Sequence, residues 1–206
     1  MEVAIIKYNA GNIYSVITAL VRLGVHPLLT DDSEAIRKAD CVLFPGQGEA
    51  CGAMDYLREH RLDEVIRSSR QPVLGICVGQ QLLCRHSEEG DTDCIGVFDT
   101  DVKRFIPQSH EDKVPAMGWN ELYDLRSPLF AHLNEKDFVY FVHSYYVPVC
   151  DWTAAKADFI HPFSAALHRD NFYATQFHPE KSGRVGVQIL ENFLSLTKEF
   201  TSKKQL

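Results

Sequence analysis

The stretch of sequence that decides the fold lies on both sides of a cysteine. Residues 72–83 read PVLGICVGQQLL. The apolar run at 72–76 is typical of a buried strand, and residues 78–86 have the apolar spacing of a helix. Cys77 therefore stands at a predicted strand-to-helix turn, and the glycines two residues before and after it let the two elements approach closely. In this setting, Gly-x-Cys-x-Gly has the form of a nucleophile elbow with cysteine in place of serine.

The position of Cys77 favours a reactive thiolate. A helix N-terminus brings partial positive charge to the sulfur, and Val78 supplies the first backbone N–H after it, a natural oxyanion donor. The alternative is a small buried cysteine in an ordinary connection, which is what most free cysteines are. Because strand, turn and helix agree, we interpret Cys77 as the nucleophile. The other five cysteines are interpreted as packing residues: Cys41 in a strand, Cys84 on the helix after the elbow, and Cys51, Cys94 and Cys150.

A cysteine nucleophile needs a base, and His178 is the best placed of the nine histidines. It ends a predicted strand within QFHPE, residues 176–180, with Glu180 two residues on. In an extended segment these two side chains point to the same side, so the carboxylate can bind one ring nitrogen and leave the other for the thiol. A solvated ion pair is the alternative, and the upstream elbow favours catalysis over it. His143 has no adjacent acid and His161 precedes a proline in a loop, so both rank lower.

A second oxyanion donor is expected from the sequence PGQG, residues 45–48. It follows a predicted strand at the edge of the sheet where the elbow should emerge. The two glycines, Gly46 and Gly48, permit backbone N–H groups to turn toward a bound carbonyl. An ordinary tight turn is the alternative.

The order of the predicted elements indicates an α/β fold. In the first hundred residues, predicted strands alternate with predicted helices. The strands are at 3–7, 26–29, 41–44 and 72–76, and the helices are at 12–23, 53–68 and 78–86. A further short helix begins at Asp32 or Ser33 and ends before Asp40. Strand-like segments then follow at 102–105, 137–142, 145–147, 153–159, 164–168 and 172–177, before a helix at 184–196. We expect one domain over residues 1–206, with a central, mostly parallel mixed sheet flanked by helices and antiparallel additions in the second half.

The composition excludes several classes of protein. A net charge of −7, spread along the chain, argues against nucleic-acid and polybasic membrane partners. No apolar run approaches the ~18 residues of a membrane span, the N-terminus lacks the pattern of a signal peptide, and no cysteines have the C-x-x-C spacing. We expect a reduced cytoplasmic protein. With no phosphate-binding glycine loop and no ligand cluster at metal spacing, we expect no cofactor and no metal.

These motifs resemble, in order and spacing, those of class I (triad) glutamine amidotransferases. The matching segments are 45–48, 75–81 and 176–180. Further segments resemble one branch, the glutaminase subunits of imidazole glycerol phosphate synthases: residues 8–16, 113–120, 140–145 and 178–183. The resemblance runs from the first predicted strand to the last helix and implies the amidotransferase fold.

The resemblance also implies roles for individual residues. Cys77 matches the nucleophile, His178 the base and Glu180 its orienter. Further matches fall into three groups: Gly46, Gln47, Gly48 and Val78 for the oxyanion, Gln81, Ser144 and Tyr145 for the glutamine substrate, and Gly11, Asn12, Asn120 and Lys181 for the interface with a synthase subunit. Three residues depart from the family pattern: Gln47 stands where valine is usual, Gln80 where methionine is usual, and Ala116 where histidine is usual.

The implied activity is hydrolysis of L-glutamine to glutamate and ammonia. The ammonia would pass through a protected channel to a separate (β/α)₈ cyclase subunit, which makes imidazole glycerol phosphate and aminoimidazole carboxamide ribotide in histidine biosynthesis. Three alternatives stay open: a glutaminase subunit of another synthase, a non-catalytic module that docks a partner, and, more distantly, a cysteine peptidase. The intact Cys77, His178 and Glu180 argue against the docking module.

Overall fold

The computed structural model describes residues 1–8, 13–46 and 48–204. The strands are β1 Val3–Ile6, β2 Leu28–Thr30, β3 Cys41–Gly46, β4 Val73–Cys77, β5 Cys84–Ser87, β6 Thr92–Asp93, β7 Phe98–Arg104, β8 Ala116–Glu121, β9 Phe138–His143, β10 Tyr145–Tyr146, β11 Thr153–Phe159, β12 His161–Arg169 and β13 Phe172–Thr175. The helices are α1 Ile13–Arg22, α2 Ser33–Lys38, α3 Ala50–Glu59, α4 Leu62–Arg67, α5 Val78–Leu82 and α6 Gly183–Lys204, with short 3₁₀ helices η1 Pro128–Phe130 and η2 Pro179–Lys181.

The main sheet has seven strands in the order β11-β12-β13-β4-β3-β1-β2. The pairs from β2 through β13 are parallel, and β12 and β11 are added antiparallel. Every residue of β3 and β4 is buried, which is why these strands are continuous apolar runs rather than alternating ones. The predicted fold class, a mostly parallel mixed sheet with late antiparallel additions, is confirmed.

The carboxyl ends of three neighbouring strands position the site. In a parallel sheet these ends lie at one edge, which is where α/β proteins bind ligands. β3 ends at Gly46, which is paired with Cys77 at the end of β4. On the other side of β4, Thr175 at the end of β13 is paired with Ile76. The sheet thus brings residues 45–46, 77–81 and 176–180 together, although they are far apart in the sequence.

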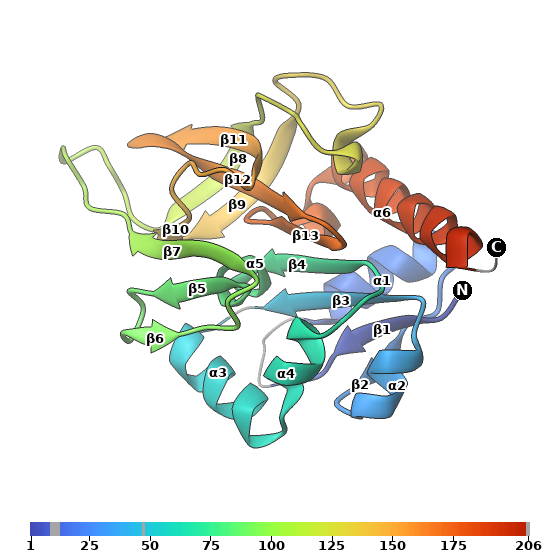
Figure 1. The fold of residues 1–206 in the computed structure, drawn as a ribbon. Coiled ribbons are helices and arrows are strands. Elements are labelled where there is room, and N and C mark those ends of the chain that lie inside the picture. The colour runs from blue at the N-terminus through green and yellow to red at the C-terminus, as the bar shows by residue number, and fades with distance from the viewer. Residues whose placement is uncertain (9–12, 47, 205–206) are drawn as a thin grey trace.

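Further elements surround this sheet, as Figure 1 shows. The helices α2, α3 and α4 gather in the lower part of the view, and α6 runs along the upper right. The late strands β8, β9, β11 and β12 form the upper part, and the two chain ends lie close together. Two smaller sheets, β10-β7-β5-β6 and β8-β9, complete the fold.

Two predicted helices differ in the structure. The predicted helix at 53–68 is two helices, α3 and α4, separated at Arg61, which has a left-handed φ of 55°. The buried apolar residues continue through both helices, so their spacing gave no sign of the break. The predicted helix at 78–86 is wrong beyond Leu82. Cys84 lies on strand β5, not on a helix, because this segment pairs with β7 and β6.

Candidate active site

Cys77 sits in a strained turn between β4 and α5. Its φ is 55° and its ψ is −110°, a backbone conformation that costs a non-glycine residue about 1–3 kcal/mol. The glycines around it allow the packing. A Cβ at Gly79 would overlap the carbonyl oxygen of Phe44, and one at Gly75 would lie 2.8 Å from Leu83 Cδ1. The elbow predicted from the sequence is therefore present, with a shorter helix behind it.

His178 and Glu180 form a buried pair. Nδ1 of the imidazole lies 2.8 Å from Oε1 of the carboxylate, and both side chains are 2% exposed. Because the carboxylate accepts, Nδ1 carries the proton and Nε2 is left free on the other side of the ring. Nε2 is buried and makes no hydrogen bond of standard geometry with the described residues.

The protonation of His178 is set by opposing effects. Burial alone would lower its pKa, but the charges of the neighbouring thiol and of the hydrogen-bonded Glu180 carboxylate outweigh burial and raise the pKa to about 9. Cys77 and His178 line the same cavity. At neutral pH the ring is therefore protonated and can stabilise a thiolate at Cys77.

The contact between His178 and Glu180 arises differently from the sequence prediction. The segment after His178 is not extended. Residues Pro179–Lys181 form the 3₁₀ helix η2, and His178 is its N-terminal cap residue. The tight turn, rather than strand geometry, brings the carboxylate back to the ring.

A serine missed by the sequence interpretation holds this turn in place. Ser182 donates its hydroxyl to the carbonyl oxygen of His178 at 2.6 Å and accepts the N–H of Tyr140 at 3.0 Å. The N–H of His178 donates to the carbonyl of Tyr140 at 2.9 Å. Residues 178–183 and 140–145 had been noted as motifs, but no role had been predicted for Ser182, because its contact with Tyr140 joins residues that are remote in sequence.

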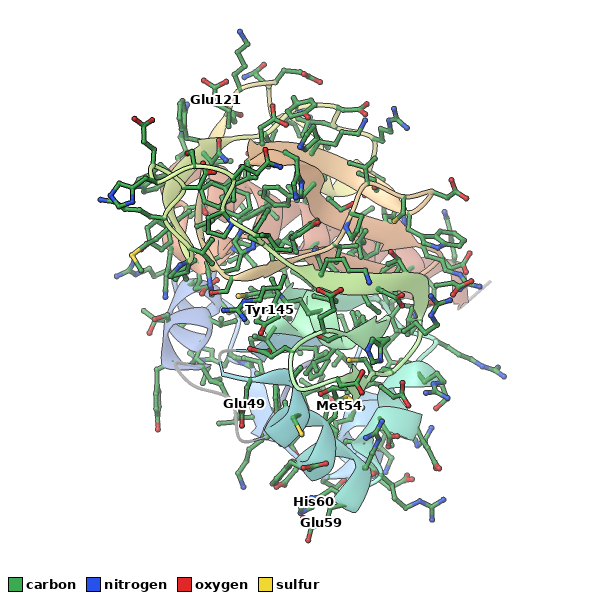
Figure 2. The ribbon with its side chains drawn as sticks, turned by 90° about the vertical axis from the view of Figure 1, so that its left-hand side faces the viewer. Glu49, Met54, Glu59, His60, Glu121 and Tyr145 are labelled. Atoms are coloured by element: carbon green, nitrogen blue, oxygen red, sulfur yellow. The ribbon has the colours of Figure 1, made fainter. Side chains whose placement is uncertain are left out.

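A cavity of about 520 Å³ opens beside these residues. It is lined by Cys77 and His178 together with most of the residues predicted to bind substrate or the oxyanion. Its lining includes Gly48, Cys77, Val78, Gln81, Ser144, Tyr145, His178 and Lys181. In Figure 2, Tyr145 lies near the middle of the view, between Glu121 at the top and Met54 of α3 below.

The strand before the cavity is held by Tyr8. Its hydroxyl donates to the carbonyl of Pro45 at 2.8 Å. A Cβ at Gly46 would overlap this hydroxyl, so glycine is needed where β3 reaches the site. Burial first, and then the negative charge of a Cys77 thiolate, raises the pKa of Tyr8 well above its usual range. Gln47, predicted to contribute to the oxyanion site, lies outside the described residues.

Two buried glutamines connect the substrate side of the cavity to the sulfur. Nε2 of Gln81 lies 3.2 Å from the carbonyl oxygen of Tyr145 and 3.0 Å from Oε1 of Gln176. Nε2 of Gln176 in turn lies 3.7 Å from Cys77 Sγ. The sequence had placed Gln176 in the QFHPE motif without giving it a role.

Known proteins of similar sequence show which family has this site. The sequence profile described as "Glutamine amidotransferase class-I" matches residues 4–196. The chain belongs to the class I glutamine amidotransferase family. Imidazole glycerol phosphate synthase subunit HisH of Bacteroides thetaiotaomicron is 63% identical over 196 residues, which cover 95% of this chain and 100% of that protein. The Escherichia coli protein of the same name is 42% identical, with the same coverage of both chains.

Solved structures agree with this amidotransferase assignment at the level of the fold. A crystal structure from Thermoplasma acidophilum has a TM-score of 0.79 at 21% identity, over 100% of this chain and 98% of that one. A glutamine amidotransferase from Thermotoga maritima has a TM-score of 0.64 at 16% identity, over 100% of this chain and 86% of that one. The family resemblance expected from the motifs is confirmed.

The two lower-ranked histidines lie in different surroundings in this amidotransferase. His143 lines the cavity, but its Nδ1 is 2.7 Å from the carbonyl of Tyr145, and no carboxylate of the described residues pairs with it. Burial lowers the pKa of His143 to about 4, so the ring is neutral. His161 packs beside Phe105 and Tyr146.

Of the four residues predicted at a partner interface, the structure describes two, Asn120 and Lys181. Asn120 lies on β8, where its amide donates to the carbonyl of Asp158 at 2.8 Å. Lys181 lines the cavity, and Gly11 and Asn12 lie outside the described residues. Beside Asn120, Met117 and Trp119 are 67% and 56% exposed.

Two of the departures from the family pattern can be located. Gln80 is buried, and its amide nitrogen lies 3.3 Å from the carbonyl oxygen of Ser164, while its Oε1 has no partner among the described residues. Ala116 is buried opposite His143 in the β8–β9 pair. Among the helices that the structure describes, none has the length and apolar character needed to cross a lipid bilayer.

Proposed function

We propose that this chain is the glutaminase subunit of an imidazole glycerol phosphate synthase, with Cys77, His178 and Glu180 as its catalytic triad. The observation that carries the proposal is the buried His178–Glu180 pair beside a cysteine on a strained elbow, at one cavity. The identity of 63% to a HisH subunit supports the choice of branch. Together these favour a catalytic subunit over a docking module and a histidine-pathway subunit over one of another synthase.

The first half-reaction forms a thioester. The Cys77 thiolate attacks the side-chain carbonyl carbon of L-glutamine, and its C=O electrons move to the oxygen. When this tetrahedral intermediate collapses, the C–N bond breaks and protonated His178 gives the Nε2 proton to the departing nitrogen. Ammonia leaves, and the γ-glutamyl group stays on the sulfur.

The second half-reaction releases glutamate. The imidazole, now neutral, accepts a proton from a water molecule as that water attacks the thioester carbon. Collapse of the second tetrahedral intermediate breaks the C–S bond and restores the thiolate and the imidazolium. Glu180 stays ionised throughout, holding the proton on Nδ1 and stabilising the charged ring.

The negative oxygen of both intermediates needs hydrogen-bond donors. We assign one donor to the backbone N–H of Val78, which follows the nucleophile and lines the cavity. We assign the second to a backbone N–H in the segment Gly46, Gln47 and Gly48. Loss of one such donor typically costs ~10²–10³ in turnover, so the geometry of this segment would control the rate. Gln81, Ser144 and Tyr145 would hold the glutamine.

The proposed partner is a (β/α)₈ cyclase subunit that uses the ammonia to form imidazole glycerol phosphate and aminoimidazole carboxamide ribotide. A protected passage between the two sites has a chemical motive, since ammonia protonates in water and ammonium is not a nucleophile. Asn120 and Lys181, with Gly11 and Asn12, are proposed to contact the partner. We place the synthase in the cytoplasm and propose that residues 1–206 form one amidotransferase domain, supported by the continuous family match over 4–196.

Glutamine hydrolysis measured with and without the cyclase subunit and its ligand tests this function. We expect slow hydrolysis by the chain alone and a rise in rate with the liganded partner, because coupling between the two sites would favour the active oxyanion geometry. Cys77→Ser should abolish turnover in the complex. Equal rates with and without the partner, or turnover by Cys77→Ser close to that of the wild type, would refute the proposal.

A further inference from the structure

We infer that Gln176 is a positioning residue for the nucleophile: its side-chain amide donates a hydrogen bond to the sulfur of Cys77 and ties that sulfur, through Gln81, to the segment proposed to hold the substrate. The inference rests on the proposed function for its meaning in catalysis. The residues in contact all lie in the part of the chain that the structure describes. The contacts are the 3.7 Å approach of Nε2 to Sγ and the 3.0 Å hydrogen bond to Gln81.

The direction of the amide chain is fixed by its far end. The carbonyl oxygen of Tyr145 can only accept, so Gln81 must turn its NH₂ group toward it. That same NH₂ group lies 3.0 Å from the side chain of Gln176, which must therefore present its oxygen there. The NH₂ group of Gln176 is left facing the sulfur. Reversing the Gln176 amide would set two donors against each other at Gln81.

The backbone on which Gln176 lies is firmly held. The residue is 0% exposed, and its N–H donates to the carbonyl of Ala165 on β12 at 2.8 Å. One residue later, Phe177 is fully buried, and its carbonyl accepts the hydroxyl of Thr175 at 3.0 Å. Little freedom remains in this segment, so the amide has a fixed position from which to direct the sulfur.

The chemical effect follows from the charge on the sulfur. A hydrogen bond to an ionised acceptor is roughly twice as strong as one between neutral groups, so the Gln176 amide favours thiolate over thiol. The chain from Tyr145 through Gln81 makes the position of this donor depend on the segment proposed to bind glutamine.

The test measures the thiolate directly, without glutamine. The rate at which iodoacetamide alkylates Cys77 is followed against pH by mass spectrometry of the Cys77 peptide. The variants are Gln176→Glu, which keeps the acceptor for Gln81 but has no N–H for the sulfur, and Gln176→Met, which is neutral and lacks both. We expect the midpoint of alkylation to rise by about one pH unit in both variants.

Controls separate positioning from general structural damage. Cys51 is exposed, so its alkylation serves as an internal reference whose midpoint stays constant. Gln188→Met changes the same residue type on α6, where the amide contacts only Asn192 in the described structure, and should leave the Cys77 midpoint unchanged. Thermal unfolding reports whether each variant folds. If neither Gln176 variant folds, Gln81→Met keeps Gln176 and should still raise the midpoint by breaking the chain.

Kinetics of the complex with the cyclase complete the test. A positioning role predicts that Gln176→Glu lowers kcat by about tenfold or more while KM changes by less than about threefold. A folded Gln176→Glu or Gln176→Met protein with an unchanged Cys77 midpoint and wild-type kcat would overturn the inference. Because alkylation needs no substrate, a wild-type chain that does not hydrolyse glutamine would refute the proposed function and leave the midpoint shift to be judged separately.

Discussion

His178 pairs with a buried carboxylate and shares its cavity with the sulfur of Cys77, and these surroundings decide when it holds a proton. Its folded-state pKa of about 9 lies above the ordinary value of 6.5, because its partners outweigh burial. The interaction therefore stabilises the folded protein fully below pH 6.5, and this contribution is lost as the pH rises through about 9. Over the same range, His178 loses the proton that it is proposed to give to departing ammonia.

Glu180→Gln tests this account at the scale of one residue. The neutral amide cannot stabilise the imidazolium, so the pKa of His178 should fall, and the high-pH limb of the kcat/KM profile should move to lower pH. We expect kcat to fall by about 10²- to 10⁴-fold, as when the carboxylate of a comparable triad is neutralised. Glu191→Gln, an exposed position on α6, is the matched control. A high-pH limb that stays in place would show that Glu180 does not set the protonation of His178.

The elements around the elbow have little room between them. Strand β3 passes close to the start of α5, and the Phe44 carbonyl occupies the space where a side chain at residue 79 would be. This close approach is what places the end of β3 beside Cys77, with Gly46 and Cys77 paired in the sheet. The geometry of the site therefore depends on helix packing as well as on the proposed catalytic side chains.

Gly79→Ala should destabilise the protein through this contact. The added methyl group meets backbone rather than a flexible side chain, so β3 or α5 must shift, and overpacking of this kind typically costs 1–3 kcal/mol. We expect that loss in chemical denaturation, together with reduced glutaminase activity. Gly52→Ala is the matched control, since its Cβ would have only Glu49 Oε1 nearby, at 3.6 Å, on the exposed side of α3. That change should stabilise the helix by about 1 kcal/mol. Equal stability of Gly79→Ala and the wild type would mean that the approach is not tight.

The sequence predicts an element well when residues close together in the sequence determine its structure. Local features were predicted well. The sequence predicted both ends of β3 and of β4 within two residues, and it predicted the elbow between β4 and α5. The end of α5 was not predicted, because pairing of Cys84–Ser87 with the distant strand β7 overrides the helical pattern. The same holds at the site. The His-Pro-Glu motif can be found in the sequence, whereas the roles of Gln176 and Ser182 arise from contacts about 100 and 40 residues away.

At the scale of the whole molecule, one side of the protein joins the cavity to exposed apolar surface. Trp119 packs against Tyr140, which lines the cavity, with ring centroids 6.0 Å apart. The same indole also reaches Gly183. Its Cη2 atom lies 4.0 Å from the position that a Cβ at Gly183 would occupy, which is an ordinary van der Waals distance. The segments 113–120 and 178–183, which resemble the synthase interface, are thus neighbours in space beside the proposed catalytic residues.

Trp119→Ala tests whether this surface binds the cyclase. The indole is 56% exposed, and tryptophans at the centre of interfaces often contribute 2 kcal/mol or more, so we expect affinity for the cyclase to fall by about 30-fold or more. Calorimetric titration of the two chains measures it. At saturating partner, stimulated hydrolysis should largely recover, because the catalytic residues are unchanged. Val187→Ala on α6, 43% exposed and outside both segments, is the control. Unchanged affinity in Trp119→Ala would place the partner elsewhere, and the stimulation of hydrolysis would then need another route to the cavity.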